Sequence, residues 1–467
     1  MSNVKRETLA SSLGFLLVSA GCAVGIGNVW RFPYIVGEYG GALFVLFFVV
    51  LLAFFGLPMM VAEFAVGRAS GRTLPRAYTE LVPKTKFFPF LGKFQVAGNW
   101  LLLMSYTTVA GWMLAYAYKA LTGTLKTETG DQAMAAFGTF TQASCEQIFW
   151  MSVVLGIGVL VCSIGLRKGV ERVTKFMMAV LFVLLIVLAG YVMTLPGAME
   201  GLRFYLQPNL DVLQSHSLTE ILFAALGQCV FTLSIGMGGM AIFGSYTSKA
   251  HSLTGEGMKV IAIDLLVAFL AGLIIFPACA AYHVEPGQGP KLIFSTLPVI
   301  FADMPFGRVI GSSFFLLLSL AALTTVIAVY ENVLAIQMDS FGFTRKKAVL
   351  CSAPVIWVLS IPCALGFGLL SGFEPMGEGT CILDLEDFIV SNVLLPLGSL
   401  AVVLFCVLRR FWGWKNFETE VNTGTGLRLP KFFRFYMTWI LPVIIVVVFL
   451  TFIAEKFGLG KLLGLTA

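Results

Sequence analysis

Charge is what this sequence has least of. Asp, Glu, Lys and Arg together make up 12% of its 467 residues, whereas 58% of the residues are hydrophobic. A water-soluble protein of this length cannot cover its surface with so few charged side chains. The composition therefore excludes a soluble globular protein, and the polar stretches are too short to form a separate soluble domain.

The sequence also lacks the ~10-residue segments of alternating hydrophobicity that build a membrane β-barrel. Instead, apolar runs of about 20 residues, long enough to cross a hydrocarbon core as helices, recur from end to end. We therefore predict an all-α polytopic membrane protein. Its eleven spans are expected near 10–36, 41–67, 89–119, 147–166, 173–195, 219–246, 257–282, 308–340, 347–371, 379–408 and 433–457.

Catalytic and metal-binding motifs are missing as well. The sequence contains no phosphate loop, no HExxH motif and no Ser–His arrangement, and its nine cysteines have no metal-ligand spacing. An enzyme is therefore not expected, and a channel would need a hydrophilic lining or a ring of like charges. Most cysteines are expected to be packed thiols, although Cys145 and Cys381 lie near outer helix ends and could pair.

The beginning of the chain has a second interpretation. "KRETLASSLGFLLVSAGC" contains the basic and apolar regions of a signal peptide, and Cys22 loosely resembles a lipoprotein cleavage site. However, the apolar stretch continues past Cys22, and Ser19 stands where such sites usually have leucine. We therefore expect an uncleaved first span.

Basic residues are distributed unevenly among the expected loops. If the N-terminus lies in the cytoplasm, the inner loops hold 23 of the 31 Lys and Arg residues and the outer loops hold seven. This asymmetry predicts a cytoplasmic N-terminus and, because the number of spans is odd, an extracytoplasmic C-terminus. The basic residues are scattered over short loops, which argues against nucleic-acid binding.

Two of the expected spans are interrupted by glycine, at Gly25-Ile26-Gly27 and at Gly236-Met237-Gly238. Because these spans lie five apart, the two halves of the chain would face opposite ways across the membrane, as in an inverted-repeat transporter. Close helix packing through small residues is the alternative explanation. Within a single transporter domain at 1–467, the expected units are 1–195 (spans one to five), 219–408 (spans six to ten) and 433–457 (an extra span).

A break inside the membrane creates a binding site, because it frees backbone groups. N–H groups after a break suit a carboxylate, and carbonyls before it suit an ammonium group or a small cation. A zwitterionic amino acid with Na⁺ satisfies both. Asn28, Thr232 and Asp264 add side-chain oxygens, and a carboxylate at Asp264 needs a positive partner unless it is protonated. Thr324 and Thr325 could instead bond their own helix carbonyls.

Four strings carry a resemblance to a known family: "GCAVGIGNVWRFPY", "GLPMMVAEFAVGR", "GQCVFTLSIGMG" and "ALTTVIAVYEN". They resemble the sodium:neurotransmitter symporter family, in its bacterial amino-acid branch. A member of this branch is itself one of the known inverted-repeat transporters. The resemblance covers residues 5 to 457. It implies a 5+5 inverted repeat with discontinuous helices one and six, and Na⁺-coupled symport by alternating access in the bacterial plasma membrane.

The resemblance implies two sodium sites, each combining backbone carbonyls with side-chain oxygens. The first, which the substrate carboxylate would complete, consists of Ala23, Asn28, Thr232 and Asp264. The second consists of Gly21, Val24, Ala321, Thr324 and Thr325.

Chloride is the ion that the sequence argues against. Animal members of the family depend on chloride, held in part by a serine that corresponds to Ala268 here, and Asp264 stands where Asn is usual. A fixed carboxylate can supply the negative charge that chloride otherwise brings. The expectation is chloride-independent transport.

The resemblance also places an amino-acid substrate at the two breaks. Gly25 occupies the position of an aspartate in monoamine carriers, which implies a substrate with its own carboxylate. That carboxylate would meet Ile26, Gly27 and Tyr106, and the ammonium would meet carbonyls of Ala23, Phe231, Thr232 and Ser234. The uncharged side-chain pocket, which favours a neutral apolar or aromatic amino acid, is expected from Leu102, Val230, Phe231, Met237, Thr325, Val326 and Val329.

Gates are expected on both sides of this site. Arg31 would pair with Asp387, assisted by Gln228, to close the outer path. The inner gate would use Arg6, Asp339 and Tyr246. However, the tryptophan that normally follows this arginine in the family is missing, and Leu9 stands in its place. Further expectations are that Glu63 bonds the broken first span, that Trp30 and Tyr34 pack, and that 289–301 forms an outer lid.

Overall fold

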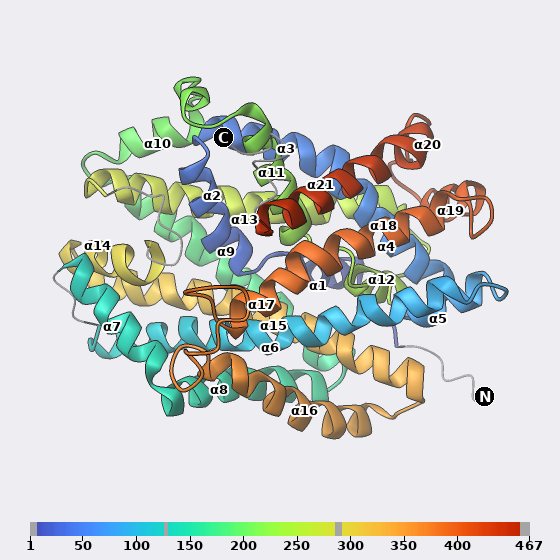
Figure 1. Cartoon of the computed structure of the whole chain (residues 1–467), viewed down its shortest axis with the longest axis horizontal. Helices are drawn as coiled ribbons and strands as arrows, with labels where there is room; N and C mark the ends of the chain where they lie inside the picture. Colours follow the sequence, from blue (N-terminus) through green and yellow to red (C-terminus); the bar gives the residue numbers. More distant parts are fainter. Residues whose placement is uncertain (1–6, 126–128, 285–291, 458–467) are drawn as a thin grey trace.

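The computed structural model describes residues 7–125, 129–284 and 292–457. Within these ranges the chain is helical and forms no strand, and most helices run along the long axis of the molecule in Figure 1. The long helices and helix pairs are α1 with α2 (Ser12–Ala23, Phe32–Glu38), α3 with α4 (Ala42–Leu51, Leu57–Ser70), α6 (Phe87–Thr122), α8 (Ser144–Ser163), α9 (Arg172–Val192), α11 with α12 (Leu218–Thr232, Gly239–Ser245), α13 (Leu253–Ala281), α15 (Gly307–Phe341), α16 (Arg345–Leu365), α17 with α18 (Ile382–Phe388, Leu395–Val407) and α20 with α21 (Phe433–Phe435, Leu441–Lys456).

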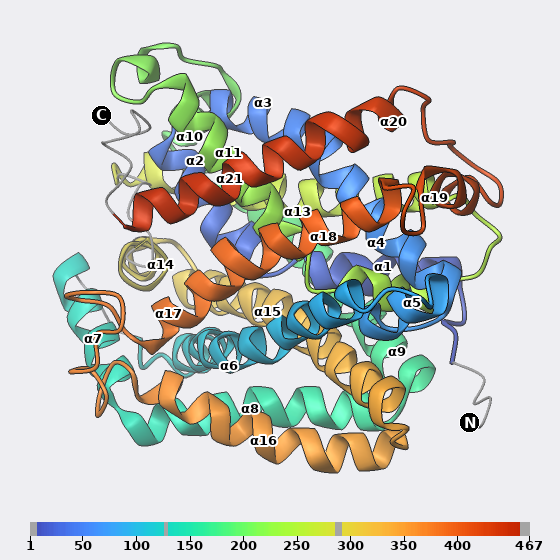
Figure 2. The same cartoon turned by 45° about the vertical axis from the view of Figure 1, so that its right-hand side comes forward.

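Short helices mark the two ends of the bundle. One end, which we call the amino end, carries α5 (Leu74–Leu81), α19 (Trp414–Val421) and the start of α1. The opposite end carries α7 (Gly130–Gln142), α10 (Ala198–Leu206) and α14 (Leu297–Asp303) (Figures 1 and 2). The long helices between them hold the apolar residues that cross the membrane.

The structure accounts for the expected spans with one qualification. Among the described residues, nine helices are long and apolar enough to cross a membrane, and Ser12–Ala23 with Gly27–Glu38 forms a tenth span that bends by 55°. The remaining expected span consists of α11 and α12, which residues 233–238 separate. The all-α fold and both discontinuous spans are therefore confirmed.

The first break follows from the backbone after Ala23. The Val24 N–H still donates to the Ala20 carbonyl at 2.6 Å, but Val24 itself is extended (φ −71°, ψ 101°) and ends the helix. A five-residue π-helix, Gly27–Arg31, then leads into α2, whose second residue is Pro33. The π-helix runs directly into α2, with the Phe32 N–H donating to the Gly27 carbonyl, and Pro33, which has no N–H, ends this π-bonded stretch.

The second break needs glycine for two reasons. Gly236 and Gly238 have φ values of 107° and 78°, a region that residues with a Cβ avoid. In addition, a Cβ on Gly236 would lie 2.2 Å from the Leu395 carbonyl oxygen, so α18 can approach only a glycine here. Ser234, with φ 49°, is one of three non-glycine residues with positive φ among the described residues.

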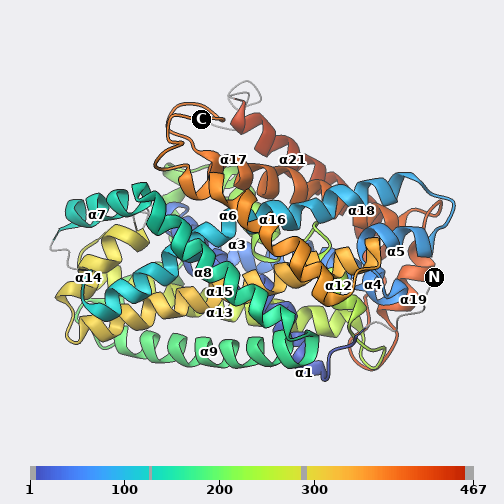
Figure 3. The ribbon, with the colours of Figure 1, turned by 90° about the horizontal axis from the view of Figure 1, so that it is seen from below.

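The two longest helices, α6 and α15, pack against each other and hold the breaks between them and the neighbouring helices. In the most apolar stretch of α15, 78% of the residues are buried, compared with 33% in the last span. Figure 3 shows α21 at the edge of the bundle. The scaffold around the breaks is therefore α6 and α15, and the last span is peripheral.

All nine cysteines are free thiols, seven of them buried. Cys145 is exposed and Cys381 is buried, and they form no disulfide with each other. The expectation of packed thiols therefore describes seven of the nine, and the suggested Cys145–Cys381 pair is not formed.

Candidate functional site

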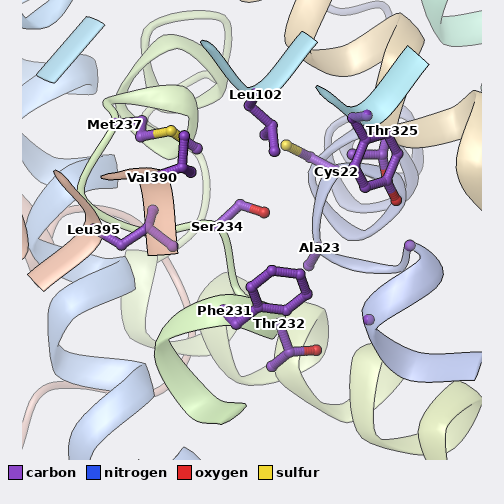
Figure 4. A pocket seen from close by; sticks show the side chains of 13 residues that line it. Cys22, Ala23, Leu102, Phe231, Thr232, Ser234, Met237, Thr325, Val390 and Leu395 are labelled. Atoms are coloured by element: carbon purple, nitrogen blue, oxygen red, sulfur yellow. The ribbon is translucent and has the colours of Figure 1, made fainter. Parts of the chain in front are cut away.

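The two breaks face each other across a small hollow of about 30 Å³ (Figure 4). Its walls come from α1, α6, α11, the segment between α11 and α12, α15 and the α17–α18 span. The lining residues are Cys22, Ala23, Gly25, Gly27, Leu102, Tyr106, Phe231, Thr232, Ser234, Met237, Thr325, Val390 and Leu395. The wall thus combines backbone polar groups of both breaks with apolar side chains.

A larger cavity of about 320 Å³ adjoins the hollow on the side of Arg31 and Asp387. The two spaces share Gly27, Leu102, Tyr106 and Phe231 as lining residues. A cavity of this size falls in the range that small molecules occupy in proteins. The hollow and the larger cavity therefore form one candidate path from the breaks toward the opposite end of the bundle.

The N–H groups at the first break are held by a tyrosine and an asparagine. The Ile26 N–H donates to the Tyr106 hydroxyl at 2.9 Å, and the Gly25 N–H donates to Asn28 Oδ1 at 3.1 Å. A Cβ on Gly25 would lie 2.5 Å from the Tyr106 hydroxyl and 2.8 Å from the Thr325 hydroxyl. The close approach of these two hydroxyls requires glycine at position 25.

Asp264 is the centre of the first oxygen cluster. Its side chain is fully buried and accepts hydrogen bonds from Asn28 Nδ2 at 2.8 Å and from the Thr232 hydroxyl at 3.2 Å. No lysine or arginine lies within 4.0 Å of this carboxylate in the described part of the chain. Neutral donors alone compensate a buried negative charge poorly, so the cluster suits a bound cation.

The second oxygen cluster lies where α1 meets α15. The Thr325 hydroxyl lies 3.4 Å from each of the carbonyl oxygens of Gly21, Val24 and Ala321. The Thr324 hydroxyl bonds the Ala321 carbonyl at 2.8 Å and lies 3.4 Å from the Val24 oxygen. Both threonines thus contact the broken helix as well as their own, and the five predicted ligands are neighbours.

The outer pair predicted from the sequence lines the larger cavity but does not form an ion pair in this structure. The Arg31 guanidinium lies 4.3 Å from the centre of the Phe231 ring, a cation–π contact. Asp387 instead accepts a hydrogen bond from the Ser391 hydroxyl at 2.9 Å. Gln228 donates to the Gly27 carbonyl at 3.2 Å, so it supports the first break and not the arginine.

The predicted inner residues fall partly outside the described chain. Arg6 belongs to the undescribed residues, so the Arg6–Asp339 contact stays a prediction. Asp339 accepts from the Thr73 N–H at 2.7 Å and from Arg72 at 3.5 Å. The Tyr246 hydroxyl bonds Glu331 at 3.1 Å, and its carbonyl accepts from the Leu9 N–H at 3.2 Å.

Glu63 requires a correction, because its hydrogen-bond partner lies in the second break and not in the first span. Its Oε1 accepts a hydrogen bond from the Gly236 N–H at 2.5 Å, and the N–H groups of Gly238, Met240 and Ala241 also point to this carboxylate. The physical reason is that α4 packs along α12, whose first N–H groups have no helical partner.

Of the thirteen predicted substrate residues, nine line the small hollow and Ile26 lines the larger cavity. Val230, Val326 and Val329 line neither, and a Cβ on Gly158 would meet Val326 at 3.1 Å, so Val326 faces α8. The sequence reasoning missed Val390 and Leu395. Val390 follows Asp387 by three residues, a helical spacing that could have identified it.

The described part of the expected lid, 292–301, is a π-helix followed by α14. Phe294 stacks on Phe137 with ring centres 4.3 Å apart and contacts Trp30 edge-on at 5.7 Å. Trp30 therefore packs, as expected, and it packs against the segment expected to form the lid. Residues 289–291 lie outside the described chain.

Comparison with known proteins places the chain among transporters. The sequence profile described as "Sodium:neurotransmitter symporter family" matches residues 6–150 and 142–460. The sodium-dependent transporter YhdH of Bacillus subtilis is 35% identical over 455 residues, which cover 97% of this chain and 99% of that protein. A sodium-dependent transporter of Haemophilus influenzae is 30% identical, with 96% and 99% covered.

A solved structure agrees with these sequence matches. The crystal structure of MhsT in complex with L-phenylalanine superimposes with a TM-score of 0.85 at 37% identity, and the match covers 96% of this chain and 99% of that one. The likeness therefore extends over nearly the whole chain, including both broken spans and the helices around them.

Proposed function

This chain belongs to the sodium:neurotransmitter symporter family, whose members are transporters and not enzymes, and it is a sodium-dependent membrane transporter. From that premise we propose that it carries a neutral, apolar or aromatic amino acid together with Na⁺ by alternating access, without a requirement for chloride. The observation that carries this proposal is Asp264, a fully buried carboxylate between the two breaks with only neutral hydrogen-bond donors.

The character of the hollow supports the substrate class. Its side-chain walls include Leu102, Phe231, Met237, Val390 and Leu395, and it is lined by no lysine, arginine, aspartate or glutamate. A charged substrate side chain would therefore be buried without a partner. MhsT, which has the same fold, was crystallised with L-phenylalanine. The lack of space for a side chain at Gly25 further supports a substrate that supplies its own carboxylate.

In this proposal two Na⁺ ions are bound at the two oxygen clusters. The first would lie at Asn28, Thr232, Asp264 and the Ala23 carbonyl, and the substrate carboxylate would complete its coordination. The second would lie between Thr324, Thr325 and the carbonyls of Gly21, Val24 and Ala321. Both sites join the broken first span to the scaffold, so bound Na⁺ would stabilise one arrangement of that span against the other.

Asp264 also supports independence from chloride. A permanent carboxylate beside the first Na⁺ balances its charge, and the fully buried Ala268, one helical turn further along α13, offers no hydroxyl to an anion. Exchange of chloride for gluconate should then leave uptake unchanged.

The gates and the orientation complete the proposal. Closure of the outer path would move Arg31 from Phe231 into contact with Asp387. The inner path would close at Arg6, Asp339 and Tyr246. With the N-terminus in the cytoplasm, the amino end of the bundle faces the cell interior of a bacterial plasma membrane, and the repeat units are 1–195 and 219–408.

Uptake into proteoliposomes tests this function. We expect labelled L-phenylalanine to accumulate in the presence of an inward Na⁺ gradient, and not with K⁺ on both sides. Competition by each of the standard amino acids then defines the substrate. Uptake that does not saturate, or equal uptake in K⁺, would overturn the symport proposal, and uptake that collapses in gluconate would overturn chloride independence alone.

A further inference from the structure

A separate hollow, of about 350 Å³, lies at the amino end of the bundle and shares no lining residue with the two cavities at the breaks. It is lined by one end of α13 and by two loops, the α12–α13 turn and the segment between α19 and α20. These loops are tied together: the Thr425 N–H donates to the Ala250 carbonyl at 2.9 Å, and the Ser252 N–H donates to the Thr425 carbonyl at 2.9 Å. The hollow therefore has a fixed floor and belongs to none of the sites described above.

The N-terminus of α13 is uncapped at this hollow. Ser252 is the N-cap residue, but its side chain makes no capping bond and donates instead to the Leu427 carbonyl at 2.6 Å. Of the next three residues, Leu253 and Thr254 are buried and do not line the hollow, whereas Gly255 lines it. The Gly255 N–H has no hydrogen-bond partner in the part of the chain that the structure describes. Free N–H groups at the positive end of a 29-residue helix bind anionic groups, phosphate above all.

A buried acid lines the same hollow and shows that the ligand is not simply an anion. Glu256 is 3% exposed, and its Oε2 has no hydrogen-bond partner among the described residues. Its Oε1 bonds Lys259 at 2.8 Å, and the lysine side chain is 55% exposed. A free anion would meet this carboxylate at close range, whereas a ligand that also carries an ammonium group would satisfy the unpartnered oxygen.

The hollow continues into a lipid-facing strip of α13. Met258, Ala262 and Leu266 follow one another at helical spacing, and Met258 and Leu266 are 46% and 47% exposed. Because α13 is a spanning helix, these exposed apolar side chains face hydrocarbon. A ligand with acyl chains can therefore place its polar head in the hollow and its chains along this strip.

From these features we infer that the hollow binds the phosphoethanolamine head group of a membrane phospholipid. The phosphate would accept hydrogen bonds from the Gly255 N–H and from Lys259, and the ammonium would donate to Glu256. The Glu256–Lys259 pair and the zwitterionic head group would lie antiparallel, so each charge gains an opposite neighbour. The orientation proposed above enters only in assigning this lipid to the cytoplasmic leaflet.

Native mass spectrometry of the purified full-length protein tests the inference. Delipidated protein is titrated with phosphatidylethanolamine, phosphatidylglycerol and phosphatidylcholine of identical acyl chains. We expect phosphatidylethanolamine to bind about tenfold more tightly than either of the others, since one lost charge-assisted hydrogen bond corresponds to about 1.4 kcal/mol or more. Equal binding of the three lipids, or a preference for phosphatidylglycerol, would overturn the assignment.

Two variants and a competitor sharpen this test. Glu256→Gln should abolish the preference over phosphatidylcholine, and Lys259→Gln, at a largely exposed side chain, should weaken binding even if the first variant folds poorly. Glu80→Gln is the matched control, because Glu80 is a 54% exposed acid at the same end that contacts Arg72 at 3.8 Å. A preference that survives Glu256→Gln in folded protein would contradict the proposed ammonium site.

Soluble glycerophosphoethanolamine distinguishes a lipid from a free head group. It should compete poorly, because it cannot use the strip of Met258 and Leu266. Competition as strong as that of the intact lipid would overturn the lipid assignment. None of these readouts depends on amino-acid uptake, so failure of the transport proposal and failure of this one are separable.

Discussion

The two helix breaks free the same kind of backbone groups but give them different partners. At the first break, the Gly25 and Ile26 N–H groups are bound by Asn28 and Tyr106, two residues assigned to the ion and substrate sites. At the second, Gly236 is held on both sides: its N–H donates to Glu63 at 2.5 Å, and its carbonyl accepts from Gln95 at 3.2 Å. Asn99 likewise donates to the Met237 carbonyl at 2.9 Å.

This difference separates a break built for ligand exchange from a break built as scaffold. Asn28 and Tyr106 can transfer their hydrogen bonds to an ion or a carboxylate. Glu63, Gln95 and Asn99 sit on α4 and α6, line neither cavity at the breaks, and have no ligand to exchange with. Changes to Asn28 or Tyr106 should therefore alter ligand affinity, and changes to Glu63, Gln95 or Asn99 should alter stability.

The largest effect is expected where the first break meets Asp264. Asp264→Ala removes the negative charge that a cation would share with Asn28 and Thr232, and breaking a buried charge pair costs about 3–5 kcal/mol. We expect the Na⁺-dependent binding of L-phenylalanine to weaken by roughly 100-fold or more, measured by scintillation proximity in Na⁺ titrations. Asp303→Ala, at an exposed acid in α14, is the control and should bind normally. An unchanged Na⁺ half-saturation in Asp264→Ala would remove the central argument for the first ion site.

The second break should respond through stability. Glu63→Ala leaves the Gly236 N–H and its neighbours buried without an acceptor, which costs about 2–3 kcal/mol. We expect a lower apparent Tm at a fixed scan rate in detergent, with a Na⁺ half-saturation of the surviving folded protein that changes by less than about threefold. The result that would reverse the comparison is an unchanged Tm together with lost Na⁺ dependence.

Particular residues show what the sequence could and could not predict. The breaks were predictable because glycine, asparagine and aspartate are costly in an apolar span, so their presence indicates a compensating site. The partner of Glu63 was not, because the contact joins α4 to a segment more than 170 residues away. The resemblance assigned it to the first span, and only the packing of α4 along α12 reveals the second break as its partner.

The outer pair illustrates the same limit. Sequence alone identifies Arg31 and Asp387 as intramembrane charges that need partners, but each has more than one available contact. In this structure Arg31 lies over Phe231, and Asp387 accepts from Ser391. Which contact forms depends on the position of two helices relative to each other, and local sequence patterns carry no information on that position.

A moderate effect is expected from added volume at the first break. Gly25→Ala would place a Cβ 2.5 Å from the Tyr106 hydroxyl and 2.8 Å from the Thr325 hydroxyl, so both residues must shift. Overpacking of this kind costs about 1–3 kcal/mol, which predicts roughly tenfold weaker L-phenylalanine binding. Gly156→Ala in α8 is the control, since no atom lies within 4 Å of the added methyl group. Equal L-phenylalanine affinities of the two variants would show that the close contact between position 25 and the two hydroxyls is not kept when the substrate is bound.

The smallest effect is expected at Tyr106, because its hydroxyl is used both before and after binding. Without ligand, the Tyr106 hydroxyl accepts a hydrogen bond from the Ile26 N–H at 2.9 Å. With substrate bound, the substrate carboxylate would accept from the Ile26 N–H instead, and the Tyr106 hydroxyl would donate to that carboxylate. Tyr106→Phe loses a bond in both states, so the difference should be about 1 kcal/mol, or about fivefold in affinity. Tyr116→Phe is the matched control: Tyr116 is 2% exposed on the same helix, and its hydroxyl makes no hydrogen bond within the described part of the chain. A 100-fold loss in Tyr106→Phe would mean that the hydroxyl contributes only to the bound state, and that the first break does not exchange partners.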